Sequence, residues 1–166
     1  MFQEAYNHSR CPKVVKQFVQ TIDVATYQSR SFEEILSDII LRRIRGVGWL
    51  ACYDIASAIA KHYNQPITKV YLMGDGPVRA IQLLQLWLHV QKVKLGNLMV
   101  PYIQIDTLCH RLREQNIEFN TRWQETQDGN ELENWLCNWQ KTQPKHEVEV
   151  VCINSNKNKH MRSLSF

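Results

Sequence analysis

The sequence predicts a mainly α-helical protein, a helical bundle with one short strand near its C-terminus. Apolar residues recur at helical spacing along most of the 166 residues. Ser31, followed three residues later by Glu34, makes a capping box, which is the signature of a helix start. Two glycine pairs, Gly46–Gly48 and Gly74–Gly76, each lie between apolar helical patterns, and each predicts a tight turn between two helices.

The composition favours one globular domain over residues 1–153, followed by a flexible basic tail over residues 154–166. Hydrophobic residues make up 44% of the chain and charged residues 22%, which excludes a disordered protein. The five cysteines are widely spaced without a Cys-x-x-Cys pair, so we expect reduced thiols in the cytoplasm. The N-terminal stretch is polar, and no apolar run approaches the ~20 residues of a membrane span. Neither a secretory signal nor a membrane helix is therefore predicted.

The first predicted helices precede the first glycine pair. Residues 11–27 place Pro12 near a helix start, and apolar residues follow at helical spacing as far as Ile22. After the capping box, a second helix is predicted from about Phe32 to Ile44.

The predicted hairpin core spans residues 32–92. A helix should run from the first glycine pair to about His62, where Asn64-Gln65-Pro66 ends it. Residues 66–73 contain the β-branched residues typical of a strand, but a repeated hairpin requires a helix, and we predict a helix. The run from Pro77 to about Lys92 is apolar nearly all round, which predicts a central buried helix.

The C-terminal third contains two further predicted helices and the strand. A cap at Asp106–Thr107 starts a helix that ends near Gln115. Asn130 can cap a last helix over residues 131–141, whose apolar residues recur at i, i+3, i+4 and i+7. Residues 147–153 alternate in hydropathy and predict one strand without an evident partner.

A Gly-x-Gly turn can hold an anion, because glycine lets the backbone approach closely and the next helix begins with unpaired N–H groups. Arg42, Arg43 and Arg45 precede the first pair, and Val47 lies within it. These arginines have two readings that the sequence leaves open: contacts to phosphate, or cations that complement a helix C-terminus. The predicted nucleic-acid-binding residues are Arg42, Arg43, Arg45, Gly46, Val47, Gly48, Gly74, Gly76 and Arg79.

Both glycine pairs resemble the hydrophobic-x-Gly-hydrophobic-Gly pattern of helix-hairpin-helix proteins. The second continues as Pro77-x-x-Ala80-x-x-Leu83, which is close to the pattern after the hairpin in that family. It departs at Asp75, where the family prefers an apolar residue and where a carboxylate would repel phosphate. The resemblance implies a tandem helix-hairpin-helix-like core that binds nucleic acid, expected to be DNA, through its phosphates. Such binding is sequence-tolerant and non-catalytic.

A broader resemblance covers residues 32–84. The run Gly46-x-Gly48-x-Leu50-x-x-Tyr53-Asp54-x-Ala56, followed by Val70-Tyr71-Leu72, is similar to a small uncharacterised bacterial family. Its members commonly read Tyr-Asp-x-Ala and then Val-Tyr-Leu-His. Met73 stands at the histidine position here, so any role of that imidazole is absent. The resemblance implies a bacterial cytosolic protein with no established activity.

The net charge of +4 is unevenly distributed. Residues 1–113 carry +6, residues 114–151 carry −5 and residues 152–166 carry +3. The basic front and middle are compatible with a surface that faces phosphates.

An alternative function comes from the acidic stretch. Trp123 lies in it with Trp135 and Trp139, and tryptophans in acidic surroundings favour a core or a protein interface over base stacking. The alternative is therefore an adaptor subunit of a bacterial defence or regulatory system, in which the hairpins are purely structural.

An enzyme that uses Tyr53, Asp54 or His110 is a third possibility, which a buried Asp54 in a cleft would favour. The simpler interpretation places Tyr53 in the core and pairs Asp54 with nearby N–H groups or an arginine. The histidines and cysteines lack metal-ligand spacing, and Gly74–Gly76 lacks the Lys-Ser/Thr of a Walker loop. We therefore predict no metal, cofactor or nucleotide hydrolysis.

Overall fold

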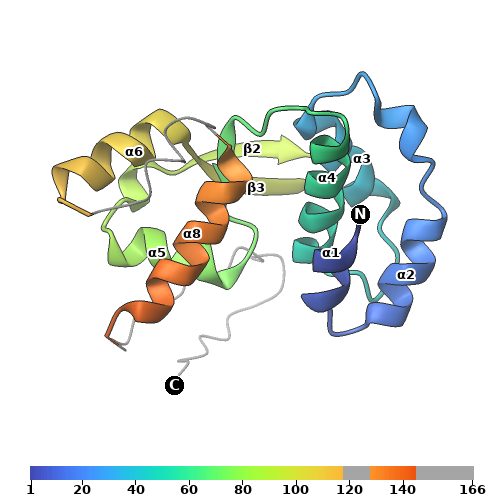
Figure 1. The fold of residues 1–166 in the computed structure, drawn as a ribbon, viewed down its shortest axis with the longest axis horizontal. Coiled ribbons are helices and arrows are strands. Elements are labelled where there is room, and N and C mark those ends of the chain that lie inside the picture. The colour runs from blue at the N-terminus through green and yellow to red at the C-terminus, as the bar shows by residue number, and fades with distance from the viewer. Residues whose placement is uncertain (118–127, 145–166) are drawn as a thin grey trace.

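The computed structural model describes residues 1–117 and 128–144, and Figure 1 traces the fold. The first elements are α1 (Gln3–Asn7), α2 (Pro12–Gln20), a 3₁₀ helix (Val24–Tyr27), α3 (Phe32–Arg42) and α4 (Trp49–His62). They are followed by β1 (Lys69–Tyr71), α5 (Asp75–Leu83), a second 3₁₀ helix (Trp87–His89), β2 (Gln91–Leu95), β3 (Leu98–Gln104), α6 (Ile105–Glu114) and α8 (Gly129–Thr142). The described chain is mainly helical, as predicted, but it also contains a small sheet.

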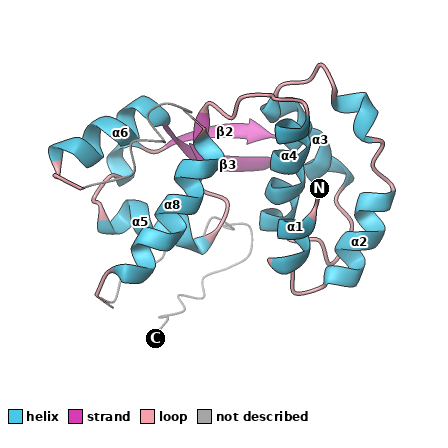
Figure 2. Ribbon diagram, viewed as in Figure 1, coloured by secondary structure: helices cyan, strands magenta, loops and turns pink. Residues whose placement is uncertain are grey.

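The sheet separates two groups of helices. Its strand order is β1-β3-β2, and both pairings are antiparallel, with Val70 opposite Ile103. Tyr71 and Val100 belong to a core shared with α1–α4, whereas Val70 and Ile103 belong to a second core shared with α5, α6 and α8. Figure 2 shows the strands between these two groups. Because successive strand residues face opposite sides, one short sheet can anchor both cores.

The helices on either side of the first glycine pair form where the sequence places them. The Ser31 hydroxyl accepts from the Glu34 amide at the start of α3, and the Glu34 carboxylate accepts from the Ser31 amide at 2.8 Å, so the capping box is confirmed. Ile35 and Ile39 are fully buried on α3. They belong to the same core as the small residues of α4, Ala51 and Ala56, which allow close helix packing.

Two predicted helices after α4 are wrong. Residues 66–73 contain strand β1, which pairs with β3. The helix predicted from Pro77 to Lys92 ends at Leu83, because Gln85 adopts a left-handed φ of 57° and the chain then enters β2. Its apolar residues do not form one buried helix: those of α5 lie in the second core, whereas Leu88 of the second 3₁₀ helix is 94% exposed. A strand depends on a distant partner, which local spacing does not reveal.

The two C-terminal helices are close to the prediction: α6 spans Ile105–Glu114 and α8 spans Gly129–Thr142. The strand predicted over residues 147–153 and the tail over residues 154–166 lie outside the described residues. Within the described ranges, every helix is too short or too polar to cross a membrane.

The α5–α8 contact leaves no room for a side chain at Gly76. A Cβ there would lie 2.8 Å from Cys137 Sγ, closer than real contacts allow. We therefore expect Gly76→Ala to lower the free energy of unfolding by about 1–2 kcal/mol through overpacking. In a Cys137→Ala background the clash is relieved, so the same substitution should then cost less. Urea denaturation of the four proteins measures this coupling, and equal costs in both backgrounds would contradict it.

Candidate nucleic-acid interface

The first glycine pair forms an exposed turn between α3 and α4. Gly46 has a φ of 96°, a left-handed conformation that favours glycine. The Val47 amide donates to the Ile44 carbonyl at 3.2 Å, and the Val47 side chain is 1% exposed. Val47 therefore anchors the turn in the core, while both glycines face solvent.

Helix α4 begins at this turn with an uncapped N-terminus. Gly48 is the N-cap residue, and because it has no side chain, no side-chain oxygen accepts from the first amides of the helix. The first turn of α4 also lacks an acidic residue. A Cβ on Gly48 would meet nothing within 4 Å, so the space in front of these amides is open. Free N–H groups together with the helix dipole make such an end attractive to anions.

Helix α2 lies against the same turn. A Cβ on Gly46 would lie 3.2 Å from Val14 Cγ1, which places the first turn of α2 beside the start of α4. Helix α2 also lacks a side-chain cap and an acidic residue in its first turn. Lys13, the neighbour of Val14, is exposed. The structure thus brings a second positive helix end to the turn, which the sequence interpretation missed.

The three arginines have different roles. The Arg43 guanidinium donates to the Val47 carbonyl at 3.0 Å and lies 3.7 Å from the centre of the Trp49 ring, so it braces the turn. Arg42 pairs with Asp38 at 2.8 Å on its own helix. Arg45 is exposed and makes no hydrogen bond or ion pair with any residue that the structure describes. Arg45 is therefore the arginine available to a ligand.

The second glycine pair follows a strand, not a helix, yet it lies beside the first. A Cβ on Gly74 would lie 3.7 Å from Leu50 Cδ1, in the first turn of α4. Gly74 is the N-cap of α5 and also lacks a side-chain cap bond. Asp75 is exposed in the first turn of α5, and Gly76 is packed against α8. Of the residues Gly74, Asp75 and Gly76, it is Gly74 that lies next to the N-terminus of α4. The carboxylate of Asp75 would repel a phosphate there.

Arg79 is less accessible. It lies on α5 and is half-buried, and it has partners within the protein. The helix that carries it packs against α8.

Asp54 is buried, but its partner is a histidine. Asp54 is 7% exposed, and its Oδ2 lies 3.0 Å from Nδ1 of His8, the residue directly after α1. Burial raises the pKa of Asp54 to about 6, although the hydrogen bond from His8 lowers it. Tyr53 lies in the core, where its ring contacts Phe32 edge-on, as the simpler interpretation expects.

Glu133 of α8 faces the same buried region. It is 4% exposed, and its Oε1 accepts from Cys137 Sγ at 3.4 Å. Burial raises the pKa of Glu133 to about 7; the bond from Cys137 lowers it and the negative charge of Asp54 raises it. Spacing could not associate Glu133 with Asp54 and His8, which lie far away in the chain. The sequence contains one local indication of a buried carboxylate. Glu133 lies between Leu132 and Leu136, which belong to the apolar stripe of the helix.

The remaining candidates do not join this cluster. His110 is exposed on α6 and lies 3.4 Å from Glu114 of the same helix. Trp135 and Trp139 stack on each other and pack against the second core, whereas Trp123 lies outside the described residues. Within the described ranges, no three Asp, Glu, His or Cys side chains gather as metal ligands would.

Comparisons of the chain with models of protein families, with curated proteins and with solved structures found no match. Function is therefore inferred from the geometry of this chain.

Proposed function

We propose that this protein binds nucleic acid through its phosphates, without cutting it, at the helix-hairpin-helix-like turn between α3 and α4. The observation that carries this proposal is the open N-terminus of α4. Gly48 leaves the first amides uncapped, and the space beside it is empty. Its first turn contains no carboxylate to occupy those amides. A nucleic acid would present its backbone phosphates to this helix N-terminus, which is a favourable site for an anion.

Three features support a polymer rather than an isolated anion. Arg45 is exposed at the turn, Lys13 is exposed on the adjacent start of α2, and this start of α2 is itself a helix N-terminus without a side-chain cap or an acidic residue in its first turn. These positive groups extend the site beyond one phosphate. Backbone contacts of this type position a protein on the polymer but do not read its bases, so binding should tolerate any sequence.

Salt dependence tests the proposal. Contacts with about three phosphates should make the affinity fall about 40-fold between 50 and 200 mM salt, because condensed counterions are released on binding. Fluorescence anisotropy with labelled duplex DNA, single-stranded DNA and RNA measures this slope and shows which polymer binds best. Arg45→Ala should weaken binding and reduce the slope by about one contact. Affinity that is absent, or insensitive to salt, on all three polymers would contradict the proposal.

A further inference from the structure

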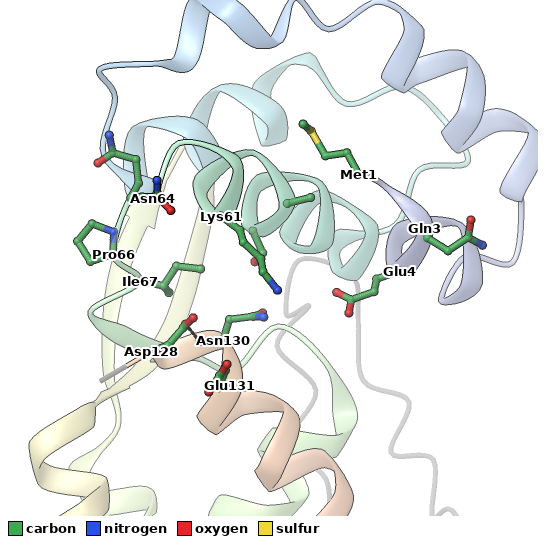
Figure 3. Close-up of a pocket in the computed structure, with 13 residues that line it drawn as sticks. Met1, Gln3, Glu4, Lys61, Asn64, Pro66, Ile67, Asp128, Asn130 and Glu131 are labelled. Carbon is green, nitrogen blue, oxygen red and sulfur yellow. Dashed lines mark hydrogen bonds between the residues drawn. The ribbon is translucent and has the colours of Figure 1, made fainter. Parts of the chain in front are cut away.

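The small sheet has one covered edge and one open edge. Its strand order is β1-β3-β2, so β1 and β2 form the two edges. The β1 edge lies against the start of α8, where the Gly129 amide donates to the Ile67 carbonyl at 2.7 Å. Figure 3 shows Asp128 and Asn130, the neighbours of Gly129, beside Ile67, where all three line a pocket. Strand β2, in contrast, pairs on one side only, with β3, among the described residues.

The backbone groups of Lys92 and Lys94 point out of the open edge. In an antiparallel pair, opposite residues alternate between those that exchange two hydrogen bonds and those that exchange none. Lys92 lies opposite Pro101, which has no N–H and whose carbonyl accepts from the Leu72 amide at 2.9 Å on the β1 side. Lys92–Pro101 is therefore a non-bonded pair, and so is Lys94–Met99. The N–H and C=O groups of both lysines make no hydrogen bond with any described residue and are left for another strand.

The side chains along this edge determine which strand it fits. Lys92 and Lys94 are exposed on the same face of β2, and neither makes an ion pair within the described ranges. Between them, Val93 is half-buried on the other face, against the first core. Side chains on the same face of neighbouring strands lie about 5 Å apart. An added strand should therefore place carboxylates beside the lysines and apolar side chains beside Val93, so its acidic residues should occupy every second position.

Two other occupants match the edge less well. If β2 of a second copy paired antiparallel and centred on Val93, Lys92 of one copy would lie opposite Lys94 of the other, and like charges directly opposite destabilise a sheet. The phosphate oxygens of a nucleic acid accept hydrogen bonds but donate none, so they would leave the carbonyls of both lysines unpaired. A peptide strand supplies donors and acceptors together.

We infer that the open edge of β2 binds an extended peptide segment of a partner protein, in which acidic and apolar residues alternate. Main-chain hydrogen bonds to Lys92 and Lys94 supply the affinity, and the two ammonium groups select the acidic side chains. Lysines on an edge strand also discourage pairing with strands that are not acidic. The α4 terminus takes no part in this interaction, which is therefore independent of the proposed nucleic-acid binding.

Fluorescence anisotropy of the full chain with two short labelled peptides tests the inference. In one peptide glutamate alternates with valine, and in the control lysine alternates with valine. We expect saturable binding of the acidic peptide only. Amide hydrogen exchange then locates the peptide: exchange should slow at Lys92 and Lys94 and stay unchanged at Val93, because the Val93 amide already bonds to β3.

Two kinds of variant separate charge from main-chain pairing. The double variant Lys92→Glu, Lys94→Glu should weaken binding of the acidic peptide about tenfold or more and create binding of the basic one, because each cross-strand charge pair changes sign. Lys94→Pro removes the outward N–H without breaking a hydrogen bond of the sheet. It should weaken peptide binding more than Lys94→Ala, which has the same charge and keeps that N–H. Thermal melts show whether each variant is folded.

Three results would overturn the inference: no binding of the acidic peptide, equal binding of both peptides, or Lys92 and Lys94 amides that are already protected in the chain alone. Duplex DNA that binds more weakly to Lys94→Pro than to Lys94→Ala would assign the edge to nucleic acid instead. Peptide affinity should be unchanged in Arg45→Ala, which weakens nucleic-acid binding. Failure of this inference and failure of the nucleic-acid proposal are therefore distinguishable.

Discussion

Gly48→Asp should reduce nucleic-acid affinity at least about tenfold while leaving the protein as stable as the wild type, or more stable. Gly48 already has the extended backbone of an N-cap residue, with φ −75° and ψ 166°, and a side chain there would meet open space. Aspartate is among the best N-cap residues and should stabilise α4 by a few tenths of a kcal/mol relative to glycine. Its carboxylate would accept from the same amides that we assign to phosphate, and its charge would repel the polymer.

Two control substitutions test whether Gly48→Asp weakens binding because its carboxylate accepts from the first amides of α4. Gly48→Ala adds a methyl group in open space without an acceptor, so it should change affinity less than about threefold. Asp75→Asn removes the carboxylate between Gly74 and Gly76, which would repel phosphate, so it should increase affinity. Anisotropy on the best-binding polymer, with thermal melts of each variant, measures both quantities. If Gly48→Asp binds like wild type, phosphate does not contact the α4 terminus.

These substitutions also separate a structural role of the glycine turn from a functional one, which a double glycine-to-alanine change would confuse. Gly46 has a left-handed φ, and a Cβ there would lie 3.2 Å from Val14 Cγ1, so Gly46→Ala would strain the turn. Gly48 has neither constraint. A loss of binding at Gly48 alone, with the fold intact, therefore reports on the ligand.

Local chemistry explains which parts of the fold were predictable. The Ser31–Glu34 capping box and the glycines at the α3–α4 turn act through neighbours a few residues away, and both are found where the sequence indicates. Strand β1 was missed because Lys69–Tyr71 pairs with residues 102–104, more than 30 positions later. Because local spacing does not reveal that partner, the β-branched residues of 66–73 are a weaker signal than the expected repeat of the hairpin.

The site was predictable in part for the same reason. The sequence identified the uncapped α4 terminus, but it could not assign the arginines, because Arg43 is held by the Trp49 ring and Arg42 by Asp38. Those contacts depend on side-chain directions around a turn, not on spacing. The proximity of Val14 and Gly74 to the turn arises from tertiary packing and left no local signal.

Glu133→Gln should stabilise the protein at alkaline pH by up to about 3 kcal/mol. Burial raises the pKa of Glu133 from its ordinary 4.5 to about 7, so the folded state favours the protonated carboxyl. The stability that this proton provides is complete below the ordinary pKa and is lost as pH rises through about 7. Above that pH the folded wild type must keep the charged carboxylate buried. The cost is about 1.4 kcal/mol for each unit by which the pKa of Glu133 is raised. Glutamine has nearly the same shape and no charge to bury.

The polar and charged groups around Glu133 determine how far its pKa is raised. The negative charges of Asp54 and Glu4 oppose its ionisation, whereas His8 and the Cys137 thiol favour it. The stability difference between Glu133→Gln and wild type should therefore be near zero below about pH 4, grow between about pH 4.5 and 7 and level off above pH 7, as guanidinium denaturation at fixed pH values would measure.

Glu114→Gln is the matched control, because hydrogen bonds from Arg111 lower the pKa of this exposed carboxyl instead of raising it. Its stability difference from wild type should not change between pH 6 and 8.5. A Glu133→Gln difference that is equally flat over this range would mean that Glu133 is already ionised in the folded protein. The favourable effects of His8 and the Cys137 thiol on the ionised carboxylate would then outweigh the cost of its burial.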